Sequence, residues 1–545
     1  MVSFPPWFGG ISAVLVPTLV TVAHALAYGR WIVDDAGITF AYARSITTGA
    51  GPVLQAGGPA VEGYSDPAWL AVLAVGRLVG LFDRGAWFGV PDYVLYPKGV
   101  ALLCCVGVYI ALYRAATAAC HRPVLVALVA GTAVALTPSF VIWSFSGLEN
   151  SLMALAVAWL AAVLVRAAMA DCLLTARTAV TCGLLAALAA LTRPEGLLYA
   201  AAYPIVVASF VRKGILLRTA RAAAVSIAAF AVPMGAYLLW RVLTFHALLP
   251  NTAMAKAQHV PHVTAVHQAI NLIDYVGWPL VLIAVACVGA VLARPSPARR
   301  TVVVLAVPLA LAVLSFVVLV RDWMGELRFA SPIWPLAALT AAVAVAAVTR
   351  EMSVRGHAVL ATCTVLACVL TAITWQQRAD RFSRGPTVPL CAVVDQARVY
   401  DEYARILGAR NGSVVLPDIG GTALTSRLRV VDLAGLADRR VAGYWAAGDM
   451  AGLRDHVFAR VRPTIIHAHG GWSTRTGLLT DPRATSGYTV VHRYSATSAD
   501  LVRTDALDTP GTLPELRAAA SRAAARHLVL GDAPRRSCGA TLRPA

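Results

Sequence analysis

The sequence predicts a polytopic α-helical membrane protein with a C-terminal extracytoplasmic α/β domain, and three observations support this fold class. Of the 545 residues, 58% are hydrophobic and only 14% are charged, and the mean hydropathy is +0.68. Soluble domains do not carry such an apolar excess. Apolar runs recur along the first two thirds of the chain, and after Trp375 the composition becomes that of a soluble domain.

About eleven apolar runs are long enough to cross the hydrocarbon layer, which is about 30 Å thick. The first run lacks a basic leader and a small-residue cleavage site, so we expect it to remain as the first helix rather than to act as a signal peptide. The runs lie near residues 7–29, 98–113, 124–144, 152–168, 178–192, 196–211, 219–243, 272–293, 301–320, 331–349 and 357–374.

The positions of Lys and Arg predict which connections face the cytoplasm. The formal net charge is +18, but the basic residues lie mostly in short loops between apolar runs, which argues for membrane orientation and against nucleic-acid binding. Five basic connections are mutually consistent as cytoplasmic, so the connections between them and the C-terminal region face outward. The outward connections are residues 145–150, 192–195, 247–257 and 321–329. This pattern predicts a multi-pass protein of the cell (plasma) membrane.

One further apolar run, residues 67–82, would place the loop after the first helix and the later outward loops on opposite membrane faces. Arg77 lies in the middle of this run, and a central Arg costs about 3 kcal/mol in a spanning helix on the insertion scale. We therefore expect an interfacial or re-entrant helix. The first outward loop then covers residues 30–97 and is the longest loop of the membrane half.

Composition also predicts the domain boundaries. Residues 1–376 should form the transmembrane domain, including the large loop at 30–97, and residues 377–509 a small extracytoplasmic α/β domain. Residues 510–545 are rich in Ala and Arg, so this tail either forms a surface helix or stays disordered.

Within the predicted α/β domain, strand-like runs are separated by Gly and Asp turns. These runs lie at residues 413–416, 428–433 and 464–467. Cys391 and Cys538 are the two cysteines of this polar region, and they either pair outside the cytoplasm or remain unpaired thiols. His467 and His469 precede a Gly-Gly-Trp run, and we interpret them as structural residues at the end of a strand.

Two adjacent carboxylates, Asp34 and Asp35, lie where the first helix leaves the membrane, just before a segment with Ile38 and Tyr42 at helical spacing. A carboxylate within hydrogen-bond reach can take the proton of an acceptor hydroxyl, and a second one can position the acceptor, a metal or the first carboxylate. For either residue alone the alternative is an N-cap, which needs no function. Both together at a membrane face favour a catalytic pair.

Further ionisable groups occur in the next outward connections, at the ends of apolar helices, and such groups are candidates for substrate binding. Glu62 and Tyr64 end the first loop, Glu149 lies in the second connection, and Arg193 and Glu195 lie in the third. The alternative for Glu62 is a solvated residue in a turn. For Arg193 and Glu195 the alternative is that they pair with each other or snorkel to the interface.

The last two outward connections carry cations that suit an anionic donor. Lys256 follows Asn251 on one connection, and Arg328 follows Asp322 and Trp323 on the other. A phosphodiester donor needs positive groups that bind its phosphate and stabilise the leaving phosphate as the sugar departs. The alternative is that both cations contact lipid headgroups.

Taken in order along nearly the whole chain, these motifs resemble those of the GT-C glycosyltransferases, and within them the actinobacterial terminal arabinofuranosyltransferases of cell-wall arabinan. No single motif is specific, but six in sequence support the resemblance. The motifs are Trp31-Ile32-Val33-Asp34-Asp35, Ser146-Gly147-Leu148-Glu149, Arg193-Pro194-Glu195, Pro250-Asn251-Thr252-Ala253-Met254-Ala255-Lys256, Asp322-Trp323-Met324 with Arg328, and Arg429-Val430-Val431-Asp432-Leu433-Ala434-Gly435-Leu436.

The resemblance implies a GT-C fold with about eleven transmembrane helices and an inverting transfer at the outer membrane face. The sugar would be an arabinofuranosyl unit, passed from decaprenyl-phosphate arabinose to an arabinan acceptor of the cell envelope. It also implies Asp34 as the general base, supported by Asp35, with Lys256, Arg328 and Arg193 at the donor phosphate. The other candidates would bind the substrates: Glu62, Tyr64, Glu149, Glu195, Asn251, Asp322 and Trp323.

Two features depart from the family pattern. Val320-Arg321 stands where Gly-Gly is expected before the Asp-Trp element, and the C-terminal region is shorter than in the mycobacterial members.

Within the class, the alternative is a transferase for another polyprenyl-phosphate sugar such as mannose. Outside it, the alternatives are a non-catalytic membrane factor and a transporter, although transporters place polar groups near the bilayer midplane and often show inverted repeats. The spacing of Asp34, Asp35, Glu62 and Glu149 in the sequence does not decide whether these carboxylates bind a divalent cation.

Overall fold

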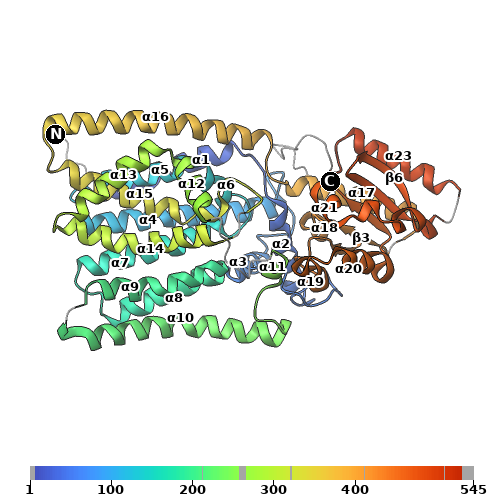
Figure 1. Cartoon of the computed structure of the whole chain (residues 1–545), viewed down its shortest axis with the longest axis horizontal. Coiled ribbons are helices and arrows are strands. Elements are labelled where there is room, and N and C mark those ends of the chain that lie inside the picture. Colours follow the sequence, from blue (N-terminus) through green and yellow to red (C-terminus); the bar gives the residue numbers. More distant parts are fainter. Residues whose placement is uncertain are drawn as a thin grey trace. The chain divides into compact units, whose positions relative to one another are not determined.

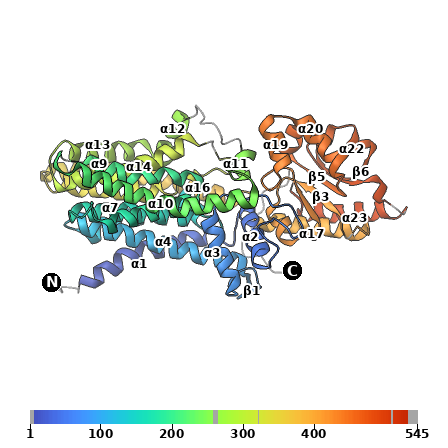
Figure 2. The ribbon, with the colours of Figure 1, turned by 90° about the horizontal axis from the view of Figure 1, so that it is seen from below.

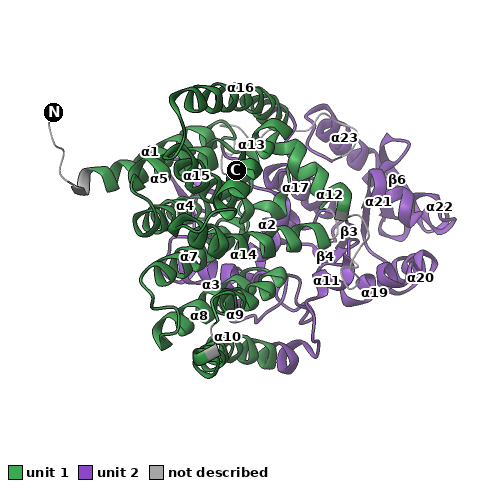
Figure 3. Cartoon of the chain, turned by 60° about the vertical axis from the view of Figure 1, so that its left-hand side comes forward, with its two compact units in different colours: residues 1–29, 97–240, 261–383 green, residues 30–96, 241–260, 384–545 purple. Residues whose placement is uncertain are grey.

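The computed structural model describes residues 6–211, 213–256, 265–319, 322–409, 411–507 and 510–530. The chain forms two compact units (Figure 3), which are described separately. Unit 1 consists of Met1–Gly29, Pro97–Trp240 and Pro261–Ser383. Unit 2 consists of Arg30–Tyr96, Arg241–Val260 and Arg384–Ala545, so three segments that are distant in the sequence fold together in each unit.

Unit 1 is built from helices that run side by side (Figure 1), because nearly every segment in it is apolar and helical. α4, α10 and α16 each continue into unit 2 at one end. The elements are α1 (Pro6–Leu26), α4 (Asp92–Ala119), α5 (Pro123–Leu136), α6 (Pro138–Ser144), α7 (Asn150–Met169), α8 (Ala176–Thr192), η1 (Pro194–Ala201), α9 (Ala202–Ser209), η2 (Lys213–Ile215), α10 (Leu216–Phe245), α12 (Ala265–Val276), α13 (Trp278–Leu292), α14 (Pro297–Val318), η3 (Arg328–Ala330), α15 (Ile333–Thr349) and α16 (Val354–Arg384).

Six helices among the described residues are long and apolar enough to cross a membrane, and the number rises to eight if each of two bent pairs is one span. The chain is therefore a multi-pass α-helical membrane protein, as predicted, but the count of eleven spans is not confirmed. α5 and α6 meet at 71° at the break before Pro138, and α12 and α13 meet at 98° at Gly277, whose φ is 96°. α8 and α15 are apolar but have only 17 residues each.

α7 lies at the centre of unit 1 and packs against α8 and α14. It is mostly buried, and small residues let neighbouring backbones approach closely in such bundles. At Gly183 of α8, a Cβ would lie 2.3 Å from the carbonyl oxygen of Ser226 on α10, so only glycine permits this helix contact. α10 and α16, by contrast, expose many large aliphatic side chains, which is the character of surfaces in contact with lipid.

Unit 2 contains a five-stranded sheet with the order β4-β3-β5-β7-β6. Figure 2 labels β3, β5 and β6 of this sheet. β3 is parallel to both β4 and β5, whereas β7 is antiparallel to β5 and β6. The strands are β3 (Ser413–Leu416), β4 (Arg429–Asp432), β5 (Ile465–Ala468), β6 (Tyr488–Ser495) and β7 (Ser498–Arg503). The three runs expected from the sequence are all strands. β6 and β7 were not expected, and the register shifts between them break the regular alternation that sequence reasoning uses.

Short helices and turns surround this sheet, and the first loop contributes two of them. They are α2 (Asp34–Thr47), α3 (Pro67–Leu78), α11 (Asn251–Ala255), α17 (Leu390–Ile406), α18 (Gly420–Thr425), α19 (Arg439–Ala447), α20 (Met450–Asp455), η4 (His456–Val461), α21 (Gly470–Thr476), η5 (Leu478–Thr480), α22 (Arg483–Ser486), η6 (Thr504–Ala506) and α23 (Thr512–Ala525), with the short hairpin β1 (Ala86–Trp87) and β2 (Val90–Pro91). α2 packs against α3, α17 and α18, which brings the first loop and the C-terminal segment into one core.

The start of the tail is a helix, α23, which buries Leu516 and Ala520 and packs against α17 and β6. The residues from 531 onward, including Cys538, lie outside the described residues. Cys391 on α17 is disulfide-bonded, so it is not the unpaired thiol considered as one alternative, and its pairing with Cys538 stays an expectation.

The apolar run at 67–82 forms α3, which has 12 residues. At 1.5 Å per residue this helix is about 18 Å long, shorter than the hydrocarbon layer. Arg77 is buried and its Nε lies 3.1 Å from Oδ2 of Asp83, while Nη1 donates to Thr47 on α2. Arg44 of α2 also pairs with Asp83, so this charge cluster fixes α3 against α2.

Candidate active site

Asp34 is the first residue of α2 and its carboxylate is anchored to the start of α18. Oδ1 accepts from the backbone N–H of Gly421 at 2.7 Å, and Oδ2 accepts from that of Gly420 at 3.0 Å. A Cβ at position 420 would lie 1.9 Å from the carbonyl oxygen of Asp34, so glycine is required for this approach. The N-cap of α2 is Val33, and Asp34 therefore does not cap its own helix.

The surroundings of Asp34 favour its neutral form. Its side chain is almost completely buried, and burial raises the pKa of this carboxyl well above its ordinary value. The charge of Asp418 raises this pKa further and that of Asp35 adds to it, while the N–H groups of Gly420 and Gly421 oppose the shift. Asp34 and Asp35 are thus coupled carboxylates, and below we call them the carboxylate pair.

Asp35 is the accessible member of the carboxylate pair. Its side chain is 21% exposed, and its Oδ2 lies 4.0 Å from Nζ of Lys256, whose side chain is 34% exposed. Lys256 follows α11, and α11 is held in place by Asn251. The Nδ2 of Asn251 donates to the carbonyl oxygens of Gly435 at 2.7 Å and Leu436 at 2.9 Å. The structure therefore brings Asp35, Lys256 and the Asn251 motif together.

Asp432, from the last sequence motif, shapes the loop that receives Asn251. Its carboxylate accepts from the backbone N–H groups of Ala434 at 2.9 Å, Gly435 at 3.0 Å and Ala437 at 2.7 Å. Burial raises the pKa of Asp432 to about 7, although these three N–H groups favour its charged form. The motif thus builds a tight turn, with Gly435 at a φ of 76°, and presents two carbonyl groups to Asn251.

Glu62 and Tyr64 lie in the interior of unit 2 rather than on its surface. The Glu62 carboxylate receives Nε of Arg241 at 2.6 Å and Nη2 at 3.1 Å, a bidentate pair that is almost fully buried. The Tyr64 ring packs edge-on against Tyr42. Glu62 is therefore not the solvated turn residue considered as its alternative. Sequence reasoning missed Arg241, and the signal for it was a lone cation near the end of an apolar run.

In unit 1, the remaining candidates form one buried ion-pair network. Arg193 pairs with both Glu149 and Glu195, and Nη2 of Arg328 lies 3.4 Å from Glu149. Nη1 of Arg328 also lies 3.3 Å from Oδ2 of Asp322. The pairing considered as an alternative for Arg193 and Glu195 is thus present. It joins the end of α8 to the start of α7 and to the segment before η3.

The charge of this network bears on the expectation that Arg193 and Arg328 bind a phosphate. Two guanidinium groups face three carboxylates, which leaves a net charge of −1 when all five are ionised. Arg193 also stacks over the ring of Phe329 at 4.3 Å. Trp323, in contrast, is exposed. Both arginines are neutralised by carboxylates in the described structure, and their binding to a phosphate stays a prediction.

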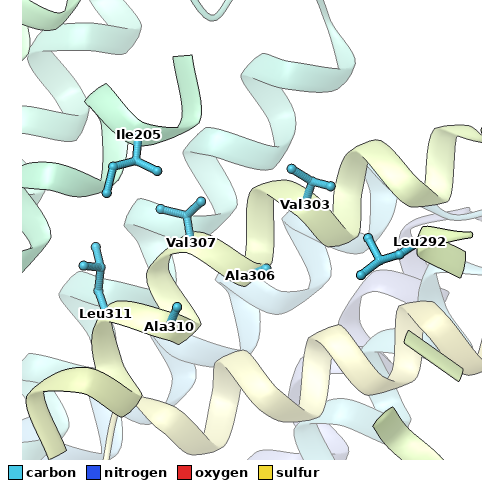
Figure 4. Close-up of a pocket in the computed structure, with 7 residues that line it drawn as sticks. All are labelled: Ile205, Leu292, Val303, Ala306, Val307, Ala310 and Leu311. Atoms are coloured by element: carbon cyan, nitrogen blue, oxygen red, sulfur yellow. The ribbon is translucent and has the colours of Figure 1, made fainter. Parts of the chain in front are cut away.

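Unit 1 also contains a cavity of about 350 Å³ between helices (Figure 4). Its lining comes from α9, α13 and α14 and is entirely aliphatic: Ile205, Leu292, Val303, Ala306, Val307, Ala310 and Leu311. Such a surface can accommodate a hydrocarbon chain but supplies no acid, base or cation. Among the described residues, no group of three or more His, Cys, Asp or Glu side chains is arranged to hold a metal ion. Val320-Arg321, the departure from the family pattern, lies outside the described residues.

Comparisons with known proteins bear on the fold. No protein-family model matches the sequence, and no curated protein matches it either. The structure is similar to ArnT from Cupriavidus metallidurans in the apo state, with a TM-score of 0.55, 14% identity, and coverage of 91% of this chain and 99% of that chain. It is also similar to the archaeal oligosaccharyltransferase AglB from Archaeoglobus fulgidus in complex with an inhibitory peptide and a dolichol-phosphate, with a TM-score of 0.53, 10% identity, and coverage of 85% and 70%.

A third match, the arabinosyltransferase EmbB from Mycobacterium smegmatis, has a TM-score of only 0.36 at 15% identity and covers 89% of this chain and 41% of that chain. This TM-score is too low to support any statement about which sugar the protein would transfer. The likeness to AglB and ArnT supports the GT-C type of fold that the sequence motifs implied, and at these identities it establishes the fold alone.

Proposed function

We propose that the protein is a membrane glycosyltransferase of the GT-C type that transfers a sugar from a polyprenyl phosphate to a glycan acceptor. The observation that carries this proposal is the accessible Asp35 carboxylate beside Lys256, held by the anchored Asp34. The fold similarity to AglB, which was solved with a dolichol-phosphate, supports a lipid-linked donor.

In the proposed reaction, the oxygen of an acceptor hydroxyl attacks the anomeric carbon of the donor sugar. The bond between this carbon and the phosphate oxygen breaks, and polyprenyl phosphate leaves with the bonding electrons, so the configuration inverts. Asp35 takes the hydroxyl proton. We assign this role to Asp35 rather than to Asp34, which the sequence motifs favoured, because Asp34 is buried and both of its oxygens accept from backbone N–H groups.

Lys256 has the complementary role in this proposal. Negative charge develops on the leaving phosphate, and an ammonium group stabilises it. In the structure described above, the same ammonium group lies near Asp35. An incoming phosphate therefore competes with Asp35 for Lys256, and its binding leaves the carboxylate freer to accept a proton.

The finer assignment of the sugar rests on the sequence motifs. They favour β-D-arabinofuranosyl transfer from decaprenyl-phosphate arabinose to an arabinan acceptor, with mannose transfer as the alternative. The test is to incubate purified protein in lipid nanodiscs with radiolabelled polyprenyl-phosphate arabinose or, separately, polyprenyl-phosphate mannose, together with a short arabinan oligosaccharide. We expect only the arabinose label to extend the acceptor. Transfer of mannose instead would overturn the assignment of arabinose as the sugar. No transfer from either donor would overturn the proposal that the protein is a glycosyltransferase.

The proposal also places the carboxylate pair on the extracytoplasmic face. Single cysteines at Val90 and Leu216 test this in intact cells, in a background where the exposed Cys363 and Cys368 are serine. A membrane-impermeant maleimide should label position 90 directly, and position 216 only after permeabilisation, because the basic connection before α10 is predicted to be cytoplasmic. The same background without an added cysteine is the control. Equal labelling of both positions from outside would contradict the orientation.

A further inference from the structure

Two residues outside all of the sequence motifs meet beside Asp34. Asp418 follows β3 and His469 follows β5, and these strands are parallel neighbours in which Val414 pairs with Ile465 and Val415 with Ile466. Continuing this register by three residues places Asp418 opposite His469. Side chains at the carboxyl ends of neighbouring parallel strands meet at one edge of the sheet, and in α/β folds this edge is where ligands bind.

Asp418 and His469 form a direct contact, and we call them the Asp418–His469 pair. Nε2 of His469 lies 2.6 Å from Oδ2 of Asp418, and their side chains are 18% and 11% exposed. Asp418 is two residues before Gly420, whose N–H holds Asp34. The Asp418–His469 pair is therefore built into the loop that fixes the carboxylate pair.

A second imidazole lies behind His469. His467 is two residues earlier, so it points to the same face of β5, and the two rings are 5.3 Å apart. Nδ1 of His467 lies 2.8 Å from Oδ1 of Asp500, which also accepts from the hydroxyl groups of Tyr400 and Tyr403. This buried network fixes the strand end that carries His469. A histidine with a fixed carboxylate partner at a partly open sheet edge can change its charge near neutral pH.

We propose that the Asp418–His469 pair is a charge switch that sets the protonation state of the carboxylate pair, so that Asp418 and His469 are positioning residues of the proposed transfer. The inference rests on the proposed function for its catalytic consequence, but the electrostatic coupling exists in the protein whether or not it transfers a sugar. When His469 is an imidazolium, it compensates the charge of Asp418. When His469 is neutral, the full negative charge of Asp418 acts on Asp34.

The direction of the effect follows from the sign of these charges. Burial is the largest cause of the raised pKa of Asp34, and among the charged groups Asp418 contributes most. A compensated Asp418 therefore lets the carboxylate pair lose its proton at lower pH, and an uncompensated Asp418 makes the pair hold its proton to higher pH. The shift therefore appears in the titration of Asp34, on which the charge of Asp35 also acts.

The other charged groups packed around α2 do not provide this switch. Lys256, after α11, lies beside Asp35, and Asp66 before α3 accepts from Thr39. Arg44 and Arg77 are both engaged by Asp83. On α17, which also packs against α2, Asp395 pairs with Arg398, Asp401 accepts from Ser426 and Glu402 pairs with Arg522. None of these groups is a histidine. Asp432, at the end of β4, is a further carboxylate whose pKa burial raises to about 7, but it is held by the N–H groups of Ala434, Gly435 and Ala437, and both test variants leave it unchanged.

The test compares Asp418→Asn and His469→Gln in the full-length protein in nanodiscs. Asn and Gln keep a hydrogen bond between the two positions but remove the charge. The first readout is the midpoint of the acid limb in the pH profile of transfer. The second is the midpoint of the Asp34 titration, followed by carboxyl carbon NMR of ¹³C-aspartate-labelled protein. The Asp34 signal is the one that is lost in Asp34→Asn. We expect Asp418→Asn to lower both midpoints by about one pH unit and His469→Gln to raise both.

Asp505→Asn is the matched control. This variant removes the same charge from unit 2 as Asp418→Asn does. Asp505 follows β7, and the end of β7 pairs with the start of β5, so Asp505 lies at the end of the sheet opposite to His469. The two midpoints of Asp505→Asn should equal those of the wild type.

Unchanged midpoints in both test variants, or shifts of the same sign, would overturn the switch even if transfer is measured. If no donor supports transfer but the NMR midpoints move in opposite directions, the switch stands and the proposed function fails. If Asp34→Asn does not fold, the Asp34 signal is identified as the one whose titration midpoint falls in Asp35→Asn, because that variant removes the charge of Asp35 beside Asp34.

Discussion

Asp35→Asn is expected to reduce sugar transfer by about 10²- to 10⁴-fold, which is the usual contribution of a general base. Asparagine has nearly the same shape as aspartate but cannot take the acceptor proton. Because Asp35 is partly exposed, the folded protein should remain nearly as stable as the wild type. The measurements are initial rates at saturating donor and acceptor, and the midpoint of thermal unfolding in the same detergent or nanodisc.

Asp34→Asn and Asp505→Asn are the informative controls for this experiment. Asp34→Asn points an amide N–H₂ at one of two backbone N–H groups, so it should lose stability as well as activity, by about 1 to 3 kcal/mol. Asp505→Asn removes an exposed charge and should change neither rate nor stability. Full activity in Asp35→Asn together with a stable, inactive Asp34→Asn would show that Asp34 is the base.

Gly420→Ala is expected to destabilise unit 2 strongly. The added Cβ would lie 1.9 Å from the carbonyl oxygen of Asp34, and backbone atoms cannot move away as a side chain would. The start of α18 must then separate from α2, which breaks both hydrogen bonds to the Asp34 carboxylate. We expect a loss of about 1 to 3 kcal/mol, as for overpacking in a core, and loss of transfer because Asp35 moves with α2.

Gly443→Ala provides the control of opposite sign. Gly443 lies inside α19, nothing lies within 4 Å of its added Cβ, and alanine is the better helix former. This variant should therefore gain about 0.5 to 1 kcal/mol. Thermal unfolding of the two variants beside the wild type measures the difference. A Gly420→Ala protein as stable as wild type would mean that the contact between α2 and α18 does not hold the carboxylate pair.

Several features were accessible from the sequence because they depend on local composition. The apolar runs, the short apolar helix within residues 67–82 and the strands β3, β4 and β5 each reflect a pattern within one segment. The number of spans was harder to predict, because breaks at Pro138 and Gly277 bend runs that read as continuous apolar segments.

The contacts of the candidate residues could not be predicted in this way, because the fold decides which partner each side chain meets. Glu62 and Asn251 were predicted to bind substrate, yet the structure places Arg241 on one and two backbone carbonyls on the other. Arg193 was predicted to meet a phosphate, yet it is paired with Glu149 and Glu195. The pairing of Arg193 with the nearby Glu195 was the alternative that the sequence offered, but the other partners lie far along the chain, so spacing could not reveal them.

The sequence by itself determined that this is a multi-pass membrane protein with paired carboxylates after its first helix, because hydropathy and residue order are local properties of the chain. Only the tertiary structure decided that Asp34 is the anchored carboxylate and Asp35 the open one, since that difference arises from two glycine N–H groups nearly 400 residues away. It also brought Asp418 and His469 beside them through the register of β3 and β5. Burial and pairing depend on which distant segments meet, and that is a property of the fold.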